Sequence, residues 1–366
     1  MGETHTGLFY SNRTSRHRSS LSSRVAPAQT QRAIHMLAAT VRESSFKPAH
    51  FQRARKTVQR QVRSQGYSLR GAAHNHVLQR LYGPNHTLGQ HSGHAAGEVE
   101  KHDLEAVKNA YADRFGPESC ALIVVGDVQP SAVHGWAEDA FGDWQGTSGK
   151  PPRYKRPRWQ PRGKRFLFLH TGKADLAQIA VGQKVPGRLS EDYAAMRVLV
   201  SALGGVGRLD SRLNQALRER EGMTYGADAA YEPRIDGGTL TLFARVARDR
   251  AEAASRRMLA EMSRLQTEPL SARELENARA AVLEELAANM ETGSAAATQL
   301  ASLFQVGLLP EQLQQLAGQI GSLTPAQVQD VAKRVLDPRG ASIVVLGDLN
   351  PPYALGDWAQ DEDETY

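Results

Sequence analysis

Apolar and polar positions along the chain follow two different periods. Short apolar runs, unbroken or alternating, predict β-strands at 166–170, 177–182 and 238–246. Apolar residues at every third or fourth position predict helices at 29–43, 192–203, 211–221, 248–266, 271–291, 294–307 and 324–336. Strands and helices are interspersed without regular βαβ alternation. This order favours an α+β fold whose sheet is largely antiparallel.

Local signals mark the ends of two of these helices. Gly204 and Gly205 follow the helix predicted at 192–203 and end it, and they would permit close backbone packing. The start at Thr324-Pro325 supplies an N-cap and a proline at the first helical position. Gln327, three residues after the cap, completes a capping box.

A repeated segment divides the chain. Residues 121–130, Ala-Leu-Ile-Val-Val-Gly-Asp-Val-Gln-Pro, return at 341–351 as Ala-Ser-Ile-Val-Val-Leu-Gly-Asp-Leu-Asn-Pro. A helical stretch at 51–62 likewise matches 275–286, with three pairs in register: Ala54 and Ala278, Arg55 and Arg279, and Val58 and Val282. The two copies lie about 220 residues apart, a period too long for a solenoid unit. It predicts two copies of one domain-sized unit.

The repeat and the composition between its copies give the domain boundaries. We expect an amino-terminal half at 1–148, a linker at 149–165 and a carboxy-terminal half at 166–366. Within 150–165 lie four prolines, eight basic residues and no acidic residue. Prolines stiffen the chain and like charges repel, so this segment is predicted to be an extended tether.

Composition indicates a globular protein. The 366 residues are 40% hydrophobic and 23% charged, and no run of about 18 apolar residues predicts a membrane span. Residues 1–12 lack the apolar stretch of a signal peptide, so the compartment stays open: periplasmic if an exported precursor was truncated, and otherwise cytoplasmic. The single cysteine, Cys120, excludes an intramolecular disulfide framework and is expected to be a small buried residue at the start of an apolar strand.

Charge is distributed unevenly along the chain. Residues 1–110 contain 16 Lys and Arg against 6 Asp and Glu, a balance of +10, and the chain total of +6 leaves −4 for the remainder. A basic third of a chain can bind nucleic acid. Here the arginines are scattered rather than grouped with aromatic residues, and no nucleic-acid motif is present. We therefore expect no nucleic-acid partner.

Histidines supply the candidates for metal ligands. His91 and His94 lie near His102, and His74 and His76 form a second close pair. The segment at 82–94 reads as a Gly-rich surface loop, so we expect no metal on this chain. The run Gly-Gly-Val-Gly-Arg at 204–208 also lacks the Gly-Lys-Ser/Thr of a phosphate-binding loop.

One string in the second copy is more specific than any of these signals. Residues 211–225 read Ser-Arg-Leu-Asn-Gln-Ala-Leu-Arg-Glu-Arg-Glu-Gly-Met-Thr-Tyr. Together with the Val-Val-Gly-Asp ends and the Phe-x-x-x-Arg-x-x-Val helix, this string makes the chain resemble the insulinase-like metallopeptidase family, which includes pitrilysin and mitochondrial processing peptidase. The resemblance runs from about residue 5 to residue 350. It implies two homologous α+β halves, each a mostly antiparallel sheet packed with helices, that form a clamshell around a chamber for peptides.

In that family the amino-terminal half binds zinc through His-x-x-Glu-His on one helix and a later glutamate. Two histidines four residues apart share a helical face, and the glutamate between them acts as general base. This chain has no such string, and the repeat would place the motif helix 20–30 residues before Met1. The position of the later glutamate falls on Gln61, a poor zinc ligand. Its counterpart in the second copy, Glu285, is expected to be a solvated helix residue.

The resemblance also singles out Arg218 and Tyr225 in the non-metal half. It implies that both assist substrate at a partner's zinc, with the guanidinium orienting a carbonyl and the phenol donating to a developing oxyanion. We therefore expect a subunit of a zinc metalloendopeptidase that is inactive alone and carries no cofactor. It would pair with a catalytic insulinase-like chain that holds zinc, or form a homodimer, and would act on peptides or unfolded polypeptide. Two alternatives stay open: an inert assembly subunit of the same fold, and an active peptidase whose His-x-x-Glu-His segment is missing.

Overall fold

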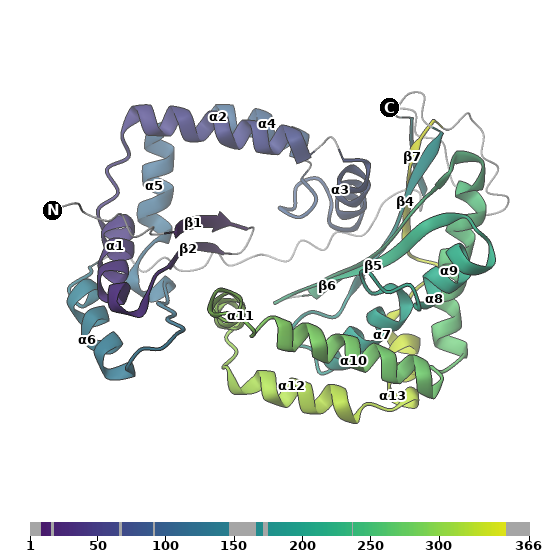
Figure 1. The fold of residues 1–366 in the computed structure, drawn as a ribbon. Coiled ribbons are helices and arrows are strands. Elements are labelled where there is room, and N and C mark those ends of the chain that lie inside the picture. The colour runs from purple at the N-terminus through teal and green to yellow at the C-terminus, as the bar shows by residue number, and fades with distance from the viewer. Residues whose placement is uncertain are drawn as a thin grey trace. The chain divides into compact units, whose positions relative to one another are not determined.

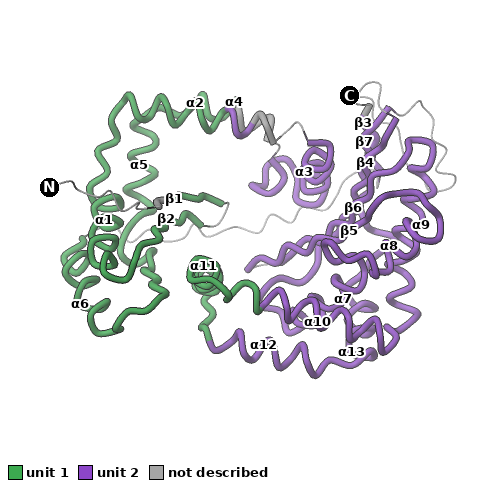
Figure 2. The backbone as a smooth tube through the Cα atoms, in the orientation of Figure 1, with its two compact units in different colours: residues 1–59, 97–156, 287–310 green, residues 60–96, 157–286, 311–366 purple. Residues whose placement is uncertain are grey.

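The computed structural model describes residues 9–15, 18–65, 68–90, 92–145, 166–170, 175–235 and 237–348. The chain forms two compact units, each assembled from separate stretches of sequence (Figure 2). The first contains residues 1–59, 97–156 and 287–310, and the second contains 60–96, 157–286 and 311–366. The predicted linker at 149–165 lies outside the described residues. The predicted half boundaries therefore stay a prediction.

The first unit is mainly helical. Its strands β1 (Phe9–Thr14) and β2 (Ser19–Arg24) form an antiparallel hairpin (Figure 1). Its helices are α1 (Thr30–Arg42), α5 (Leu104–Arg114), α6 (Pro130–Phe141) and α11 (Gly293–Gln305), with a single 3₁₀ turn, η1 (Pro27–Gln29), before α1 and another, η2 (Pro117–Ser119), after α5. Helices α2 (Pro48–Gln65) and α4 (Ser92–Lys101) are divided between the units. A small core joins α1 to α6 through Ile34, Ala38 and Ala140.

The second unit is built on a five-stranded sheet. Among the described strands the order is β3-β7-β4-β6-β5, and of their pairs only β3–β7 is parallel. The strands are β3 (Phe166–His170), β4 (Leu176–Val185), β5 (Thr224–Arg234), β6 (Gly237–Ala247) and β7 (Ser342–Gly347). The strands predicted at 166–170, 177–182 and 238–246 are confirmed as β3, β4 and β6. Strands β4 and β6 are buried on both faces along most of their length.

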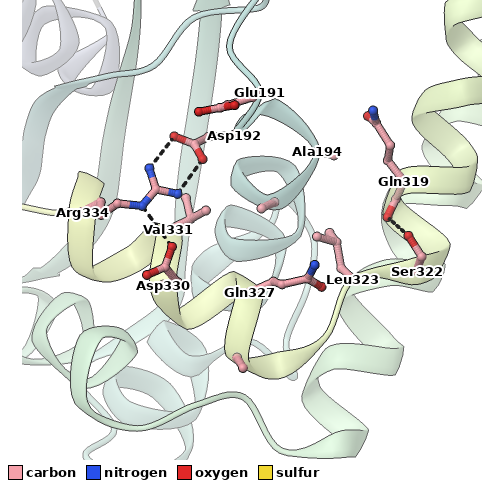
Figure 3. A pocket seen from close by; sticks show the side chains of 12 residues that line it. Glu191, Asp192, Ala194, Gln319, Ser322, Leu323, Gln327, Asp330, Val331 and Arg334 are labelled. Carbon is pink, nitrogen blue, oxygen red and sulfur yellow. Dashed lines mark hydrogen bonds and ion pairs between the residues drawn. The ribbon is translucent and has the colours of Figure 1, made fainter.

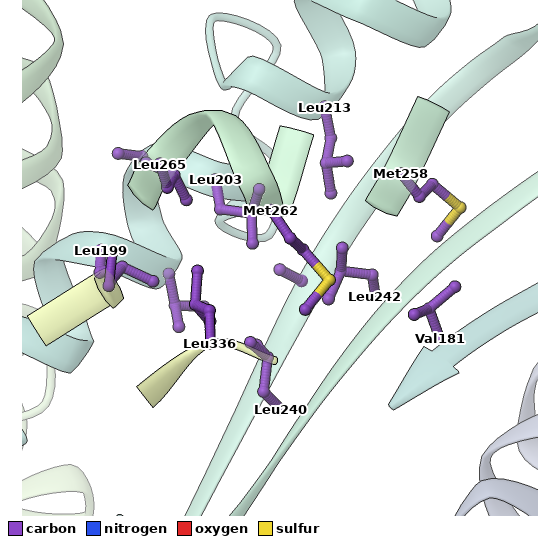
Figure 4. Close-up of a cluster of buried hydrophobic side chains, with 14 of the residues drawn as sticks. Val181, Leu199, Leu203, Leu213, Leu240, Leu242, Met258, Met262, Leu265 and Leu336 are labelled. Atoms are coloured by element: carbon purple, nitrogen blue, oxygen red, sulfur yellow. The ribbon is translucent and has the colours of Figure 1, made fainter. Parts of the chain in front are cut away.

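Helices of the second unit cover both faces of this sheet. They are α3 (Leu69–Tyr82), α7 (Tyr193–Gly204), α8 (Arg212–Asn214), α9 (Ala251–Thr267), α10 (Ala272–Ala288), α12 (Glu311–Ser322) and α13 (Pro325–Val335), with a 3₁₀ turn, η4 (Arg248–Arg250), before α9. On one face Ile179, Leu242 and Ile343 pack with α7, α9, α10 and α13 in the main core. Figure 4 shows Leu242 of β6 in this core, near Met262 of α9. The capping box predicted at Thr324 is confirmed, with Thr324 Oγ1 accepting from Gln327 N.

Helix α3 covers the opposite face of the sheet. The residues that alternate with those of the main core, Ala180, Phe243 and Val344, contact Val77 and Leu81 of α3. Fully burying two such aliphatic side chains contributes roughly 1.5–3 kcal/mol each. No helix within the described residues is long and apolar enough to cross a bilayer.

Close packing requires a glycine beneath this helix. A Cβ atom on Gly182 of β4 would lie 2.2 Å from Val77 Cγ1. Polar groups add to the contact: Arg70 donates to both carboxylate oxygens of Asp228 at 2.7 and 2.5 Å, and the Tyr82 hydroxyl lies 2.9 Å from Thr239 Oγ1. Helix α3 is therefore an integral layer of the second unit, although the sequence assigns it to the amino-terminal half.

The two copies of the repeated segment differ in structure. Residues 342–347 form β7, which is buried and paired with β3 and β4, whereas residues 121–125 form no strand in the described part of the chain. The strand predicted there is wrong, since the described residues offer it no neighbouring strands of the kind that flank β7. Cys120, predicted to be buried at the start of that strand, is exposed for the same reason.

The repeated helix also differs between the copies. In α10, Ala278 and Val282 are almost fully buried, whereas Val58 in α2, the counterpart of Val282, is 41% exposed. Glu285 follows them on α10, where it is largely exposed and receives a 2.8 Å bond from Arg197 Nη2. The same residue pattern thus forms a helix in both places, but only the second copy packs it into a core.

Candidate functional site

Residues 211–225 follow an unusual path that brings a helix end next to the start of a strand. Helix α8 continues directly into a π-helical segment, η3 (Gln215–Arg220). The chain then reverses at Gly222, whose φ of +58° lies in the left-handed region that favours glycine. Met223 N donates to Leu217 O at 2.7 Å and closes the turn. π-Helical turns are rare and frequently occur at functional sites, so this segment is a candidate on geometry alone.

The turn presents Arg218 and Tyr225, the two residues that the sequence singled out. Arg218 lies in η3 with its side chain about one third exposed, and its Nε lies 3.5 Å from Glu219 Oε1. Tyr225 is 98% exposed. The phenol hydroxyl of Tyr225 is therefore open to solvent. Both groups are thus accessible to an external ligand.

A β-bulge is the reason that Tyr225 points outward. The pairing of β5 with β6 jumps from Thr224 to Ala227, which leaves Tyr225 and Gly226 out of register. Thr224 Oγ1 lies 2.7 Å from Arg245 O and 2.9 Å from Gly226 O, and it accepts from Gly226 N at 3.2 Å. Bulges re-aim side chains next to active sites.

A buried ion pair anchors the beginning of the segment. Arg212, whose side chain is 5% exposed, donates from Nε to Glu274 Oε1 at 2.7 Å and from its terminal nitrogens to the carbonyls of Glu268 and Pro269. Partial burial alone would raise the pKa of Glu274, but hydrogen bonds from Arg212 and Ser271 outweigh it and lower that pKa to about 2. The sequence analysis did not single out this pair. A basic residue beside the apolar positions of the helix was its only signal.

The far end of the turn is held in a similar way. Arg257 of α9 donates from Nε to Glu221 Oε1 at 2.6 Å. Arg218 and Tyr225 therefore project from a turn whose two ends are fixed to α9 and α10. A fixed guanidinium and phenol can orient a peptide carbonyl and donate to negative charge that develops on it.

The residues considered as metal ligands lie on several elements. Gln61 is exposed on α2. His74 belongs to α3, and its Nε2 lies 3.1 Å from Oε1 of Glu232 in β5. His91 lies outside the described residues, as does the side chain of His94. Across the described ranges, no group of three His, Cys, Asp or Glu side chains could hold a metal ion.

A cleft of about 530 Å³ lies elsewhere on the second unit, between the start of α7 and helices α12 and α13 (Figure 3). Arg334 crosses it and donates to Asp192 at 2.8 and 3.0 Å and to Asp330 at 3.0 Å. These hydrogen bonds raise the pKa of Arg334. Arg334 thereby pairs with both carboxylates, and neither Arg218 nor Tyr225 lines the cleft.

Known proteins resemble parts of this sequence. The sequence model of the peptidase M16 inactive domain matches residues 101–282. An uncharacterized zinc protease of Mycobacterium tuberculosis is 27% identical over 167 residues, which make up 46% of this chain and 37% of that relative. The chain thus matches little more than a third of the length of this relative.

Solved structures share the fold at low sequence identity. A peptidase M16 inactive domain from Pseudomonas fluorescens superposes with a TM-score of 0.82 at 19% identity, covering 93% of this chain and 81% of that one. A chain of complex III from Candida albicans superposes with a TM-score of 0.77 at 14% identity, covering 95% of this chain and 83% of that one. The α+β architecture predicted from the sequence is confirmed. With the inactive-domain match, the zinc-protease relative and the shared fold in agreement, the chain belongs to the insulinase-like, or M16, peptidase family.

Proposed function

We propose that this chain is a non-catalytic subunit of a zinc metalloendopeptidase and completes the peptide-binding chamber of a catalytic insulinase-like partner. The observation that carries the proposal is the accessible pair Arg218 and Tyr225 on an anchored turn. The match to an inactive domain supports a non-catalytic role. So does Gln61, which stands where the family has a zinc-binding carboxylate. The partner would hold the zinc and perform hydrolysis of internal peptide bonds.

In this role Arg218 and Tyr225 act on substrate that the partner's zinc polarises. The guanidinium binds and orients a carbonyl of the peptide, and the phenol O–H donates a hydrogen bond to the oxygen on which negative charge develops. Removing one such donor from an acyl-transfer site typically lowers the rate by about 100-fold to 1,000-fold. Because these two groups are solvent-accessible before substrate binds, we expect a smaller effect, on the order of 10-fold each.

The test uses the complex with a catalytic chain that carries His-x-x-Glu-His. Cleavage of a quenched fluorescent peptide should need both chains and zinc, and Arg218→Ala and Tyr225→Phe should lower kcat/KM while gel filtration shows an intact complex. Arg220→Ala is the matched control, since Arg220 is an exposed residue of the same segment. Stoichiometric zinc and peptide cleavage by this chain alone would refute the proposal.

A second function is an inert assembly subunit, which the likeness to a complex III chain favours. The same variants separate the two functions. An assembly subunit would retain full activity of its complex in Arg218→Ala and Tyr225→Phe, whereas a chamber-completing subunit would not.

A further inference from the structure

Asn214 is a buried polar residue that joins the two elements of the candidate site. It is the last residue of α8, directly before η3, and it is 3% exposed. Its Oδ1 accepts from Ala227 N at 2.9 Å, and its Nδ2 donates to Ala227 O at 2.8 Å. The same Nδ2 lies 2.8 Å from Arg208 O and 3.1 Å from Ser211 Oγ. Every polar atom of the side chain is therefore satisfied inside the protein.

The pair of bonds to Ala227 replaces a neighbouring strand for one residue. In an antiparallel sheet the N–H and C=O of one residue point to the same side of the strand. Ala227 is paired with Ala244 of β6, and β5 is the last strand in the order of the described sheet. Its N–H and C=O face away from β6 and would be unpaired at this edge, but the side-chain amide of Asn214 binds both.

The position of Ala227 gives this contact a consequence for the site. Ala227 is the residue at which β5 re-enters the ladder after the bulge that extrudes Tyr225. Asn214 stands four residues before Arg218, at the start of the rigid turn that carries it. One side chain thus links the segment that carries Arg218 to the segment that carries Tyr225.

We propose that Asn214 is a positioning residue that holds Arg218 and Tyr225 in their working geometry. The proposal rests on the proposed function of these two residues. A side-chain amide suits the position because it offers a donor and an acceptor in one plane. An aspartate would turn an oxygen toward the carbonyls of Ala227 and Arg208, and a leucine would leave the backbone of Ala227 unpaired.

Asn214→Leu, measured in the two-chain complex with a quenched fluorescent peptide, tests the proposal. We expect kcat to fall on the order of 10-fold to 100-fold with a change in KM below about 3-fold, since small misplacement of positioned groups costs rate. Hydrogen exchange should show faster exchange at residues 224–227 than in the unmodified protein. Asn214→Ala removes the same bonds with less bulk and serves as the second variant if Asn214→Leu does not fold.

Gln183→Leu provides the matched control for stability. Gln183 is 5% exposed, donates from Nε2 to Val335 O at 2.9 Å and accepts from Asp337 N at 2.9 Å. It is thus a second buried amide that binds backbone groups of another segment, and its partners lie outside the bulge and the turn. We expect this control to lose stability comparably, but to keep its activity within about 2-fold at temperatures where it is folded.

A double-mutant cycle separates positioning from a merely structural role. If Asn214 acts through Tyr225 and Arg218, its substitution should cost less than about 3-fold when both are already replaced by Phe and Ala. The positioning role alone would be overturned if Asn214→Leu lowered kcat as much in the Arg218→Ala, Tyr225→Phe variant as in the unmodified complex. It would also be overturned if Asn214→Leu lowered kcat no more than Gln183→Leu does. If Arg218→Ala and Tyr225→Phe leave cleavage unchanged, the proposed function is wrong and the positioning role is refuted with it.

Discussion

The ion pair between Arg212 and Glu274 should make the stability of the second unit depend on pH. Glu274→Gln is the informative change, because the amide retains the shape and one acceptor but removes the charge opposite a guanidinium that is 5% exposed. The glutamate also accepts from Ser271 N at 2.8 Å and Ser271 Oγ at 2.9 Å. The substitution thus leaves a buried cation without its counter-charge.

The magnitude follows from the pKa of Glu274, which is lowered from 4.5 to about 2 in the folded protein. A shift of about 2.5 pH units corresponds to roughly 3.4 kcal/mol. One third of the side chain is exposed, so solvent screening reduces this to about 1.5–2 kcal/mol. Because the folded pKa is the lower one, this stabilisation is present above pH 4.5 and is lost as the pH falls toward 2.

Urea unfolding followed by circular dichroism between pH 7 and pH 3 measures this effect. We expect Glu274→Gln to lower the free energy of unfolding by about 1.5–2 kcal/mol at pH 7, and by less than half as much at pH 3. Glu276→Gln is the control on the same helix, because Glu276 is 75% exposed and lies 3.7 Å from its partner Arg279. A deficit for Glu274→Gln that is equal at the two pH values would refute the reasoning.

Further substitutions test the packing and the helix cap described above. Gly204→Ala should lower the free energy of unfolding in urea by about 1–3 kcal/mol, because the new Cβ would lie 2.9 Å from Ala229 N. Gly318→Ala in α12 should raise it by about 0.5–1 kcal/mol, because a Cβ there would meet nothing within 4 Å. Gly182→Ala should destabilise α3 and accelerate its hydrogen exchange. Adding Val77→Ala should partly restore protection, because it removes the methyl group that the new Cβ meets. If the double variant exchanges as fast as Gly182→Ala alone, this account of the packing is wrong. Thr324→Ala should cost about 1 kcal/mol of thermal stability through loss of the α13 cap, and Thr324→Ser should retain most of it.

The sequence predicted the second unit much better than the first. Strands β4 and β6 and helix α7 were accessible because their apolar patterns are long and regular. Strand β5 was missed, since its residues Thr224–Arg234 are mostly small or polar and a bulge interrupts their alternation. Residues 121–125 carry the same apolar run as β7 but no strand pairing, which shows that pairing is decided by neighbours and not by the run itself.

The candidate site was only partly accessible from the sequence. Arg218 and Tyr225 came from a resemblance, and the structure adds that they stand on one anchored turn. Asn214 and Arg212 could not be recognised, because their partners, Ala227 and Glu274, lie 13 and 62 residues away and come together only through folding. A polar residue in a helical pattern gives no sign that it will be buried and fully bonded.

The layer that α3 adds beneath the sheet bears on whether the chain can be divided at the predicted linker. A gene split at residues 149–165 would give one product that carries the strands and another that carries Val77, Leu81 and Arg70. The strand-bearing product would expose the apolar face of β4, β6 and β7, and the two products would have to reassociate to cover it. A chain divided at this linker would therefore need both products at once, because the sheet in one product buries this face only with the helix from the other.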